Sequence, residues 1–362
     1  MVAVPADASD ITADWLRSAA PDAEELAEVT SVRAERMAEG VGMLTEIYRL
    51  TLGDGAGGPC APATVVAKLP SSIPEVRDLC KAYRFYEREV MFYRELADTI
   101  DVKSPRCLVA EFDPATSAFV LVMEDLVDAT MGDQVAGLSP GQIKVAAERA
   151  AALHGRWWDR PELRALEGKV QPFGAPPWSG MQARHASGWK TVDAWLAGRV
   201  SPELRRIGER MCSTLGAIFR DASAGPRTLC HGDFRADNLM FTGPADAPGL
   251  TCVDWQLAVQ AAGPYDIGYM MSGSVNPDIR REHEMALLRD YHAALEAAGV
   301  AGYGFEDCFH DYRRGLLIGL TYLSQSAAAC DLTHPRTEAL YQAWAMRLDA
   351  AANDLALSEF VN

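Results

Sequence analysis

The first third of the chain alternates short runs of β-branched and aromatic residues with turn-forming segments, a pattern that predicts strands. Between the third and fourth runs, residues 74–100 place apolar side chains at intervals of three and four, which predicts one long amphipathic helix. A shorter helix, capped by Ser9 or Asp10, is expected to end near Ala20. The strands are expected at 28–37, 44–52, 64–69, 107–112 and 118–123. The first 125 residues therefore predict a compact mixed lobe.

After Gly132 the pattern changes to long helical periodicity interrupted by loops. Helices are expected at 140–158, 202–221, 278–297, 305–328 and 337–357. This change predicts two domains, an N-terminal lobe over 1–126 and a C-terminal lobe over 127–362.

One hairpin interrupts the helical half and carries a distinctive set of polar residues. The stretch HGDFRADN at 231–238 is followed by TCVDWQ at 251–256, with strand-like residues around both and a turn at 243–249. Asp233, Asn238 and Asp254 are thereby expected at the tip of the hairpin. Oxygen ligands without a His/Cys cluster favour magnesium and phosphate over zinc. An acid/base pair of Asp233 and Asp254, as in a glycosidase, is an alternative.

Two features of the N-terminal lobe suggest anion binding. Lys68 lies in an apolar strand, where a lysine is costly unless it is paired, although an edge strand could turn it to water. Gly40 and Gly42 permit a tight turn whose amides could face an anion, or they serve only the turn itself. Glu89 lies beside the apolar stripe of the long helix.

Composition narrows the class of protein. The chain has 362 residues, 49% of them hydrophobic and 23% charged, with a net charge of −16. Such a charge disfavours broad binding to nucleic acid or anionic membranes. The 8 cysteines form no C-x-x-C pair and are interpreted as reduced thiols of a cytoplasmic protein. The sequence shows no signal peptide and no apolar run long enough to span a bilayer.

The order of these elements is more informative than any one of them. A strand pair with a glycine turn, a strand lysine, a helix glutamate, a short linker, H-x-D-x-x-x-x-N and a further aspartate follow the order of protein-kinase-type phosphotransferases. With HGDFRADNLMF and VDWQ, the chain resembles the aminoglycoside phosphotransferase and choline kinase-like family. LVMEDL, GPYDIGYMMSGS and LLRDYHAAL look most like its ecdysteroid kinase-like branch. The resemblance spans roughly 37–295 and implies a bilobal α+β fold, in which a five-stranded antiparallel sheet with a helix precedes a mainly helical lobe.

The resemblance implies roles for the catalytic loop. Asp233 would accept or orient the proton of a substrate hydroxyl, and Asn238 and Asp254 would hold Mg²⁺. His231 would support the loop structurally, and Asp266 would tie the loop down from behind.

It also implies a site for ATP in the N-terminal lobe. Lys68 would contact the α- and β-phosphates and would itself be held by Glu89. The linker backbone would bind adenine, and the glycine turn would cover the phosphates, although it lacks the full G-x-G-x-x-G. The implied nucleotide-binding positions are Lys68, Glu89, Gly40, Gly42, Glu124 and Leu126.

The sequence thus predicts an ATP- and Mg²⁺-dependent kinase that phosphorylates a hydroxyl of a small molecule. Five tryptophans between 157 and 195 either form core or line a pocket for an apolar alcohol. The alternatives are an aminoglycoside- or choline-type kinase with a polar cationic substrate, a catalytically silent kinase-fold binding module, and a metal-dependent hydrolase.

Overall fold

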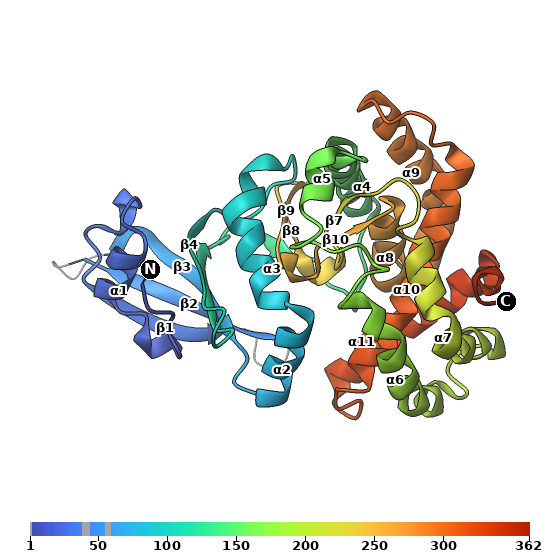
Figure 1. The fold of residues 1–362 in the computed structure, drawn as a ribbon, viewed down its shortest axis with the longest axis horizontal. Coiled ribbons are helices and arrows are strands. Elements are labelled where there is room, and N and C mark those ends of the chain that lie inside the picture. Colours follow the sequence, from blue (N-terminus) through green and yellow to red (C-terminus); the bar gives the residue numbers. More distant parts are fainter. Residues whose placement is uncertain (1, 38–43, 55–58) are drawn as a thin grey trace. The chain divides into compact units, whose positions relative to one another are not determined.

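The computed structural model describes residues 2–37, 44–54 and 59–362 and divides into two compact units (Figure 1). The first unit consists of Met1–Thr99 and Ser104–Asp128, and the second of Ile100–Lys103 and Ala129–Asn362. The first holds a five-stranded antiparallel sheet and the second is mainly helical. The predicted α+β fold class is therefore confirmed.

The sheet of the first unit has the strand order β1-β2-β3-β5-β4, and every neighbouring pair is antiparallel. Its strands are β1 (Ser31–Met37), β2 (Thr45–Gly53), β3 (Pro59–Pro70), β4 (Cys107–Phe112) and β5 (Phe119–Glu124). All five had been predicted, but β3 starts earlier than expected. Pro59 already pairs with Gly53, beyond a shift in register.

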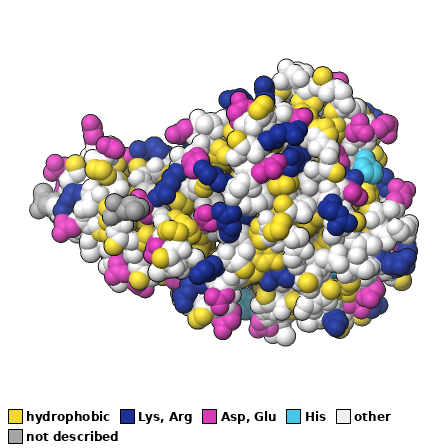
Figure 2. All heavy atoms as spheres, in the orientation of Figure 1, with side chains coloured by type: hydrophobic (Ala, Val, Ile, Leu, Met, Phe, Trp, Pro, Cys, Tyr) yellow, Lys and Arg dark blue, Asp and Glu magenta, His cyan; other side chains and the backbone are white. Residues whose placement is uncertain are grey.

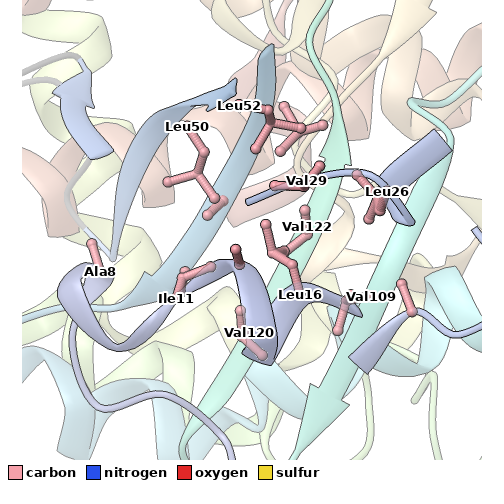
Figure 3. Close-up of a cluster of buried hydrophobic side chains, with 14 of the residues drawn as sticks. Ala8, Ile11, Leu16, Leu26, Val29, Leu50, Leu52, Val109, Val120 and Val122 are labelled. Atoms are coloured by element: carbon pink, nitrogen blue, oxygen red, sulfur yellow. The ribbon is translucent and has the colours of Figure 1, made fainter. Parts of the chain in front are cut away.

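The N-terminal segment covers one face of this sheet. It forms η1 (Ala8–Asp10), α1 (Ala13–Ala19) and η2 (Glu24–Leu26). Figure 3 shows their apolar side chains packed against those of the strands, Leu16 beside Val120 and Val122 among them. The cap of α1 is Thr12, which accepts the Trp15 N–H at 3.1 Å, so the expected capping by Ser9 or Asp10 was wrong.

The opposite face of the sheet meets a helix that is broken where one continuous helix was predicted. The segment forms α2 (Pro74–Tyr83), α3 (Phe85–Met91), η3 (Phe92–Leu96) and η4 (Ala97–Thr99). Arg84, between α2 and α3, has a left-handed φ of 56° and pairs with Glu87 at 2.7 Å. No glycine or proline marks this break. It lets α3 bury both an apolar set and Glu89, with Tyr86 stacked on Phe119 of β5 at 4.4 Å.

The second unit is built from long helices around two small sheets. Its helices are α4 (Pro140–Trp157), α5 (Pro161–Ala165), α6 (Met181–Leu196), α7 (Pro202–Asp221), α8 (Pro264–Ser274), α9 (Pro277–Ala297), α10 (Phe305–Ala327) and α11 (Pro335–Asp354). One sheet pairs β7 (Thr228–Cys230) with β10 (Val259–Ala261), and the other joins β6 (Thr130–Met131), β8 (Leu239–Thr242) and β9 (Gly249–Cys252). Short 3-10 turns complete it: η5 (Trp178–Gly180), η6 (Ala236–Asn238), η7 (Trp255–Leu257) and η8 (Leu357–Val361). The five predicted long helices are all present.

Helix α8 was not predicted, because every one of its residues is buried and it has no polar face to create a helical period. It packs closely against α10. A Cβ at Gly268 would lie 2.4 Å from the Tyr312 carbonyl oxygen, and one at Gly315 would lie 2.7 Å from the Tyr265 carbonyl oxygen. Glycine at both positions allows the two backbones to approach.

Three of the five clustered tryptophans form core, and Trp158 and Trp195 are half-buried. Trp157, Trp178 and Trp189 are buried, and the Trp189 ring fills the space above Gly208. Trp158 packs on Tyr303, with ring centroids 4.7 Å apart. The segment from 157 to 195 therefore provides no evidence of a substrate pocket.

Neither the surface charges nor the cysteines point to a particular function. Acidic and basic side chains are interspersed on the face shown in Figure 2. The cysteines whose side chains are described are all free thiols. Within the described ranges, none of the helices combines the length and apolar character needed to cross a membrane.

We predict that Gly268→Ala lowers the free energy of unfolding by about 2 kcal/mol, because the new methyl group meets α10 backbone atoms that cannot rotate away. Denaturant unfolding measures the change. Gly168→Ala is the matched control, since a Cβ there would meet nothing within 4 Å. Equal stability of the two variants would contradict the close packing of α8 on α10.

Candidate active site

The conspicuous polar residues lie at the open end of the β8–β9 hairpin. Asn238 directly precedes β8 and Asp254 follows β9, while the turn joins the far ends, at Thr242 and Gly249. Their expected placement at the hairpin tip was therefore wrong. The Val253 N–H donates to the Asn238 carbonyl oxygen at 3.0 Å, which extends the hairpin to the site and brings both segments together.

A single carboxylate holds the loop that leads from β7 into the site. Asp266, in the first turn of α8, accepts the His231 N–H at 2.7 Å and the Gly232 N–H at 3.0 Å, one on each oxygen. Its Oδ2 atom also lies 3.2 Å from Nε2 of His154, and the other ring nitrogen of His154 bonds the Tyr291 hydroxyl at 2.7 Å. Every member of this chain is buried. Two backbone donors thus fix the loop one residue before Asp233.

His231 supports the loop and has no exposed edge. Its Nδ1 accepts the Asp233 N–H at 3.2 Å, so the ring proton lies on Nε2, which donates to the Val253 carbonyl oxygen at 3.0 Å. Burial lowers the pKa of His231, which keeps the ring neutral. Gly232 adopts a φ of 86°, and a Cβ there would lie 1.9 Å from the Leu257 carbonyl oxygen. Only glycine fits between these neighbours.

The Asp233 carboxylate receives donors on both oxygens. Its Oδ1 accepts the Tyr269 hydroxyl at 2.8 Å. Its Oδ2 accepts the Asn238 amide at 2.8 Å and Nε of Arg235 at 3.3 Å. Burial alone would raise the pKa of Asp233, but the Arg235 guanidinium and the Tyr269 hydroxyl outweigh it and the pKa lies below its ordinary value. Asp233 is therefore an ionised, oriented acceptor at neutral pH.

Arg235 connects the catalytic loop to the residues around it. It donates from Nη1 to Asp237 and to the Gln134 side chain, both at 2.8 Å. The Gln134 N–H in turn donates to Asp237 at 3.2 Å, and its carbonyl oxygen accepts Arg347 of α11 at 2.6 Å. Burial would lower the pKa of Arg235, yet Asp233 and Asp237 raise it above its usual value. Asp237 and Arg235 thus brace the loop from the side.

Asn238 and Asp254 have the donor atoms that a hard cation requires. The Asn238 amide nitrogen donates to the carbonyl and the carboxylate of Asp233, both at 2.8 Å, so the oxygen of the same amide is the atom that could serve as a ligand. This oxygen accepts no hydrogen bond from any residue that the structure describes. Asp254 has a left-handed φ of 68°, rare for a non-glycine residue and often found at functional sites. The two residues fit Mg²⁺, which prefers carboxylate and carbonyl oxygen ligands.

Within the first unit, Lys68 on β3 and Glu89 on α3 form a buried ion pair. The ammonium lies 2.8 Å from Oε1 of Glu89, and the two side chains are 5% and 1% exposed. The alternative of an edge-strand lysine turned to water was wrong, because β3 is a central strand. Burying a lysine is expensive unless its charge is paired, and Glu89 supplies that pair.

The remaining predicted positions lie at the end of β5 and in the glycine turn. Glu124 ends β5, and half-buried Leu126 follows two residues later. Gly40 and Gly42 lie outside the described residues.

The sequence alone missed two contributors, Tyr269 and Gln134. Tyr269 could have been found, because it lies three residues after Asp266 and therefore on the same face of the same helix. Gln134 lies in a loop with no motif around it, and only the fold brings it to Arg235.

Comparisons with known proteins give the family and the fold. The model of the phosphotransferase enzyme family matches residues 64–307. No protein of curated function gave a match. Similar solved structures include the GDP and kanamycin complex of APH(2″)-IIIa, with 14% identity, a TM-score of 0.54 and coverage of 94% of this chain and 97% of that one.

Two further structures share the fold. The ethanolamine kinase of Plasmodium vivax is 9% identical, with a TM-score of 0.53 and coverage of 93% and 83% of the two chains. An amicoumacin kinase in complex with AMP-PNP is 11% identical, with a TM-score of 0.50 and coverage of 88% of each chain. Identities this low support the protein-kinase-like fold alone. The narrower ecdysteroid kinase-like resemblance stays a prediction.

Because the family match spans more than half of the chain and includes the whole catalytic loop, the protein belongs to the phosphotransferase enzyme family.

Proposed function

We propose that this phosphotransferase moves the γ-phosphate of ATP, with Mg²⁺, to a hydroxyl group of a small molecule. The observation that carries the proposal is the Asp233 carboxylate, held ionised by Tyr269, Arg235 and Asn238. Beside it, the Asn238 oxygen is left as a ligand atom. A catalytically silent binding module would have no need for this arrangement.

Asp233 acts mainly by orientation. A carboxylate with three donors and a lowered pKa is a weak base, so it accepts the hydrogen bond of the attacking hydroxyl and takes up the proton late in the transfer. Phosphoryl transfer suits this arrangement, because its loose transition state needs alignment more than strong deprotonation.

Charge on the phosphates is balanced by the other residues. Lys68, fixed by Glu89, would bind the α- and β-phosphates, and Asn238 and Asp254 would hold the metal. When bound, Mg²⁺ supplies neutralisation of phosphate charge. His231 and Asp266 keep the loop in place and exchange no proton with the substrate.

The acceptor we propose is an apolar alcohol. The tryptophan segment gives this proposal little support, because three of its five rings form core and Trp158 packs on Tyr303. Its support is the half-buried Tyr322, whose ring packs on that of Tyr269 at a centroid distance of 5.2 Å, while Tyr269 itself bonds Asp233. The loop acid Asp237 is already bonded to Arg235, so it offers little to a polycation. A cytoplasmic location is part of the proposal.

Release of ADP from ATP and Mg²⁺ in the presence of hydroxylated compounds tests the function. Sterol-like and aromatic alcohols form one arm, and aminoglycosides and choline form the other. Turnover with apolar alcohols supports the proposal. Turnover with only the polar compounds would overturn the proposed acceptor class, and phosphate or sugar release without ATP would indicate a hydrolase.

Asp233→Asn is expected to lower kcat on the order of a thousandfold, because the amide presents a donor where an acceptor is needed. The affinity for ATP, measured by calorimetry, should stay within about twofold of the wild-type value, because the residues proposed to contact the adenine are unchanged. Asp246→Asn, an exposed change in the β8–β9 turn, is the control. Full turnover by Asp233→Asn would remove Asp233 from the mechanism.

Tyr269→Phe keeps the ring packing and removes the donor to Asp233, so kcat should fall roughly tenfold to a hundredfold with little change in the KM for ATP. Tyr312→Phe is the control, because its hydroxyl is equally buried and bonds Glu284 at 3.0 Å, away from the loop. If both variants lose turnover equally, the effect of Tyr269 is one of stability alone.

Lys68→Met should abolish turnover and also destabilise the first unit by about 3 kcal/mol, because Glu89 loses its buried cation. The double variant Lys68→Met, Glu89→Gln should regain most of the melting temperature that Lys68→Met loses, without regaining turnover. Recovery of activity in the double variant would show that the lysine serves stability only.

A further inference from the structure

The chain forms a tight turn as it leaves β5. The Glu124 N–H donates to the Arg106 carbonyl oxygen at 2.9 Å, and the Glu124 carboxylate accepts the Arg106 N–H at 3.0 Å. One residue later, the Val127 N–H donates to the Asp125 carbonyl oxygen at 2.9 Å, which closes a three-residue turn around Leu126. The central N–H of such a turn takes no part in closing it.

The Leu126 N–H donates no hydrogen bond to any residue in the ranges 2–37, 44–54 and 59–362. The residue is half-buried. A backbone N–H without a protein partner can pair with water or with a ligand that displaces it. A ring nitrogen of a purine is an acceptor of the right kind.

Asp125 fixes this turn to the sheet through its side chain. Arg49 of β2 donates two hydrogen bonds to the Asp125 carboxylate, from Nε at 2.7 Å and from Nη2 at 3.2 Å. The Thr64 hydroxyl of β3 donates a third at 2.8 Å. The Asp125 side chain is only 5% exposed. A two-pronged arginine–carboxylate pair fixes direction as well as distance. Two strands therefore hold the residue that immediately precedes Leu126.

Stability alone gives a weak reason for this arrangement. The Arg49 side chain is 42% exposed, and ion pairs with such an exposed partner contribute about 1 kcal/mol or less. A buried carboxylate is costly compared with an apolar residue of the same size. What the clamp of Arg49, Asp125 and Thr64 does supply is a rigid position for the peptide that follows.

We propose that Asp125 is a positioning residue for the nucleotide base. Clamped by Arg49 and Thr64, it holds the Leu126 N–H where the amide donates to the adenine ring of ATP. This inference rests on the proposed function, because it requires that the protein binds ATP. It adds that recognition of the base depends on a side chain that does not itself touch the nucleotide.

Calorimetric titration of the full chain with ATP and with tripolyphosphate, both with Mg²⁺, tests the proposal. Tripolyphosphate carries the phosphate chain without a base. Asp125→Ala and Arg49→Met should each weaken ATP binding about tenfold, which corresponds to one lost hydrogen bond, and leave tripolyphosphate binding unchanged. The affinity of Thr64→Val for ATP should lie between that of these two variants and that of the wild type.

Glu111→Ala is the matched control, because it breaks an ion pair of 2.8 Å with Arg94 on the same sheet, away from the turn. It should bind both ligands as the wild type does. Unchanged ATP affinity in Asp125→Ala and Arg49→Met would overturn the proposal, as would an equal loss of ATP and tripolyphosphate binding. A wild-type protein that binds neither ligand would instead refute the proposed function. Arg49→Met preserves the test if Asp125→Ala does not fold.

Discussion

The active loop depends on one buried carboxylate, Asp266, and its bonds to two backbone N–H groups. A buried charge is tolerated only when it is fully bonded, so the loop can take this position only while His231 and Gly232 point their amides inward. The positive φ of Gly232 and the close Leu257 carbonyl oxygen leave no room for another residue. The position of Asp233 follows from this anchor.

Around Asp233, the fold combines hydrogen-bond donors of the loop itself with residues that are distant in sequence. Tyr269 comes from α8 and Arg235 from the loop itself, and Arg235 is held in turn by Gln134. Arg347 of α11 completes the layer by donating to the Gln134 and Gly273 carbonyl oxygens, both at 2.6 Å. Burial lowers the pKa of Arg347 to about 10, which shows how far this cation is withdrawn from water. The C-terminal helix is thereby tied to the catalytic loop.

The sequence predicted the five strands of the first unit, five of the long helices and the family, because each has a period or a motif that is local, but it missed α6, which begins in a proline-rich stretch. It failed where the decisive contact is not local. The break at Arg84 carries no glycine or proline, and α8 has no polar face because it is buried all round. The sequence left open whether the clustered tryptophans form core or line a pocket, because the burial of three of them depends on tertiary packing, as where Trp189 meets Gly208 of α7. Asp125 is bonded by Thr64, 61 positions earlier in the chain, and by Arg49, 76 positions earlier. No local pattern reveals contacts at such separations.

In the proposed reaction, an ionised, oriented Asp233 directs a hydroxyl group to the γ-phosphate of ATP. The most direct measurement is mass spectrometry of the products formed from ATP whose γ-phosphate carries heavy oxygen, with wild type and Asp233→Asn incubated beside the same apolar alcohols. We expect ADP and an alcohol that has gained the labelled phosphoryl group, in the wild type only. Labelled inorganic phosphate with no phosphorylated alcohol, or equal product from both proteins, would contradict it.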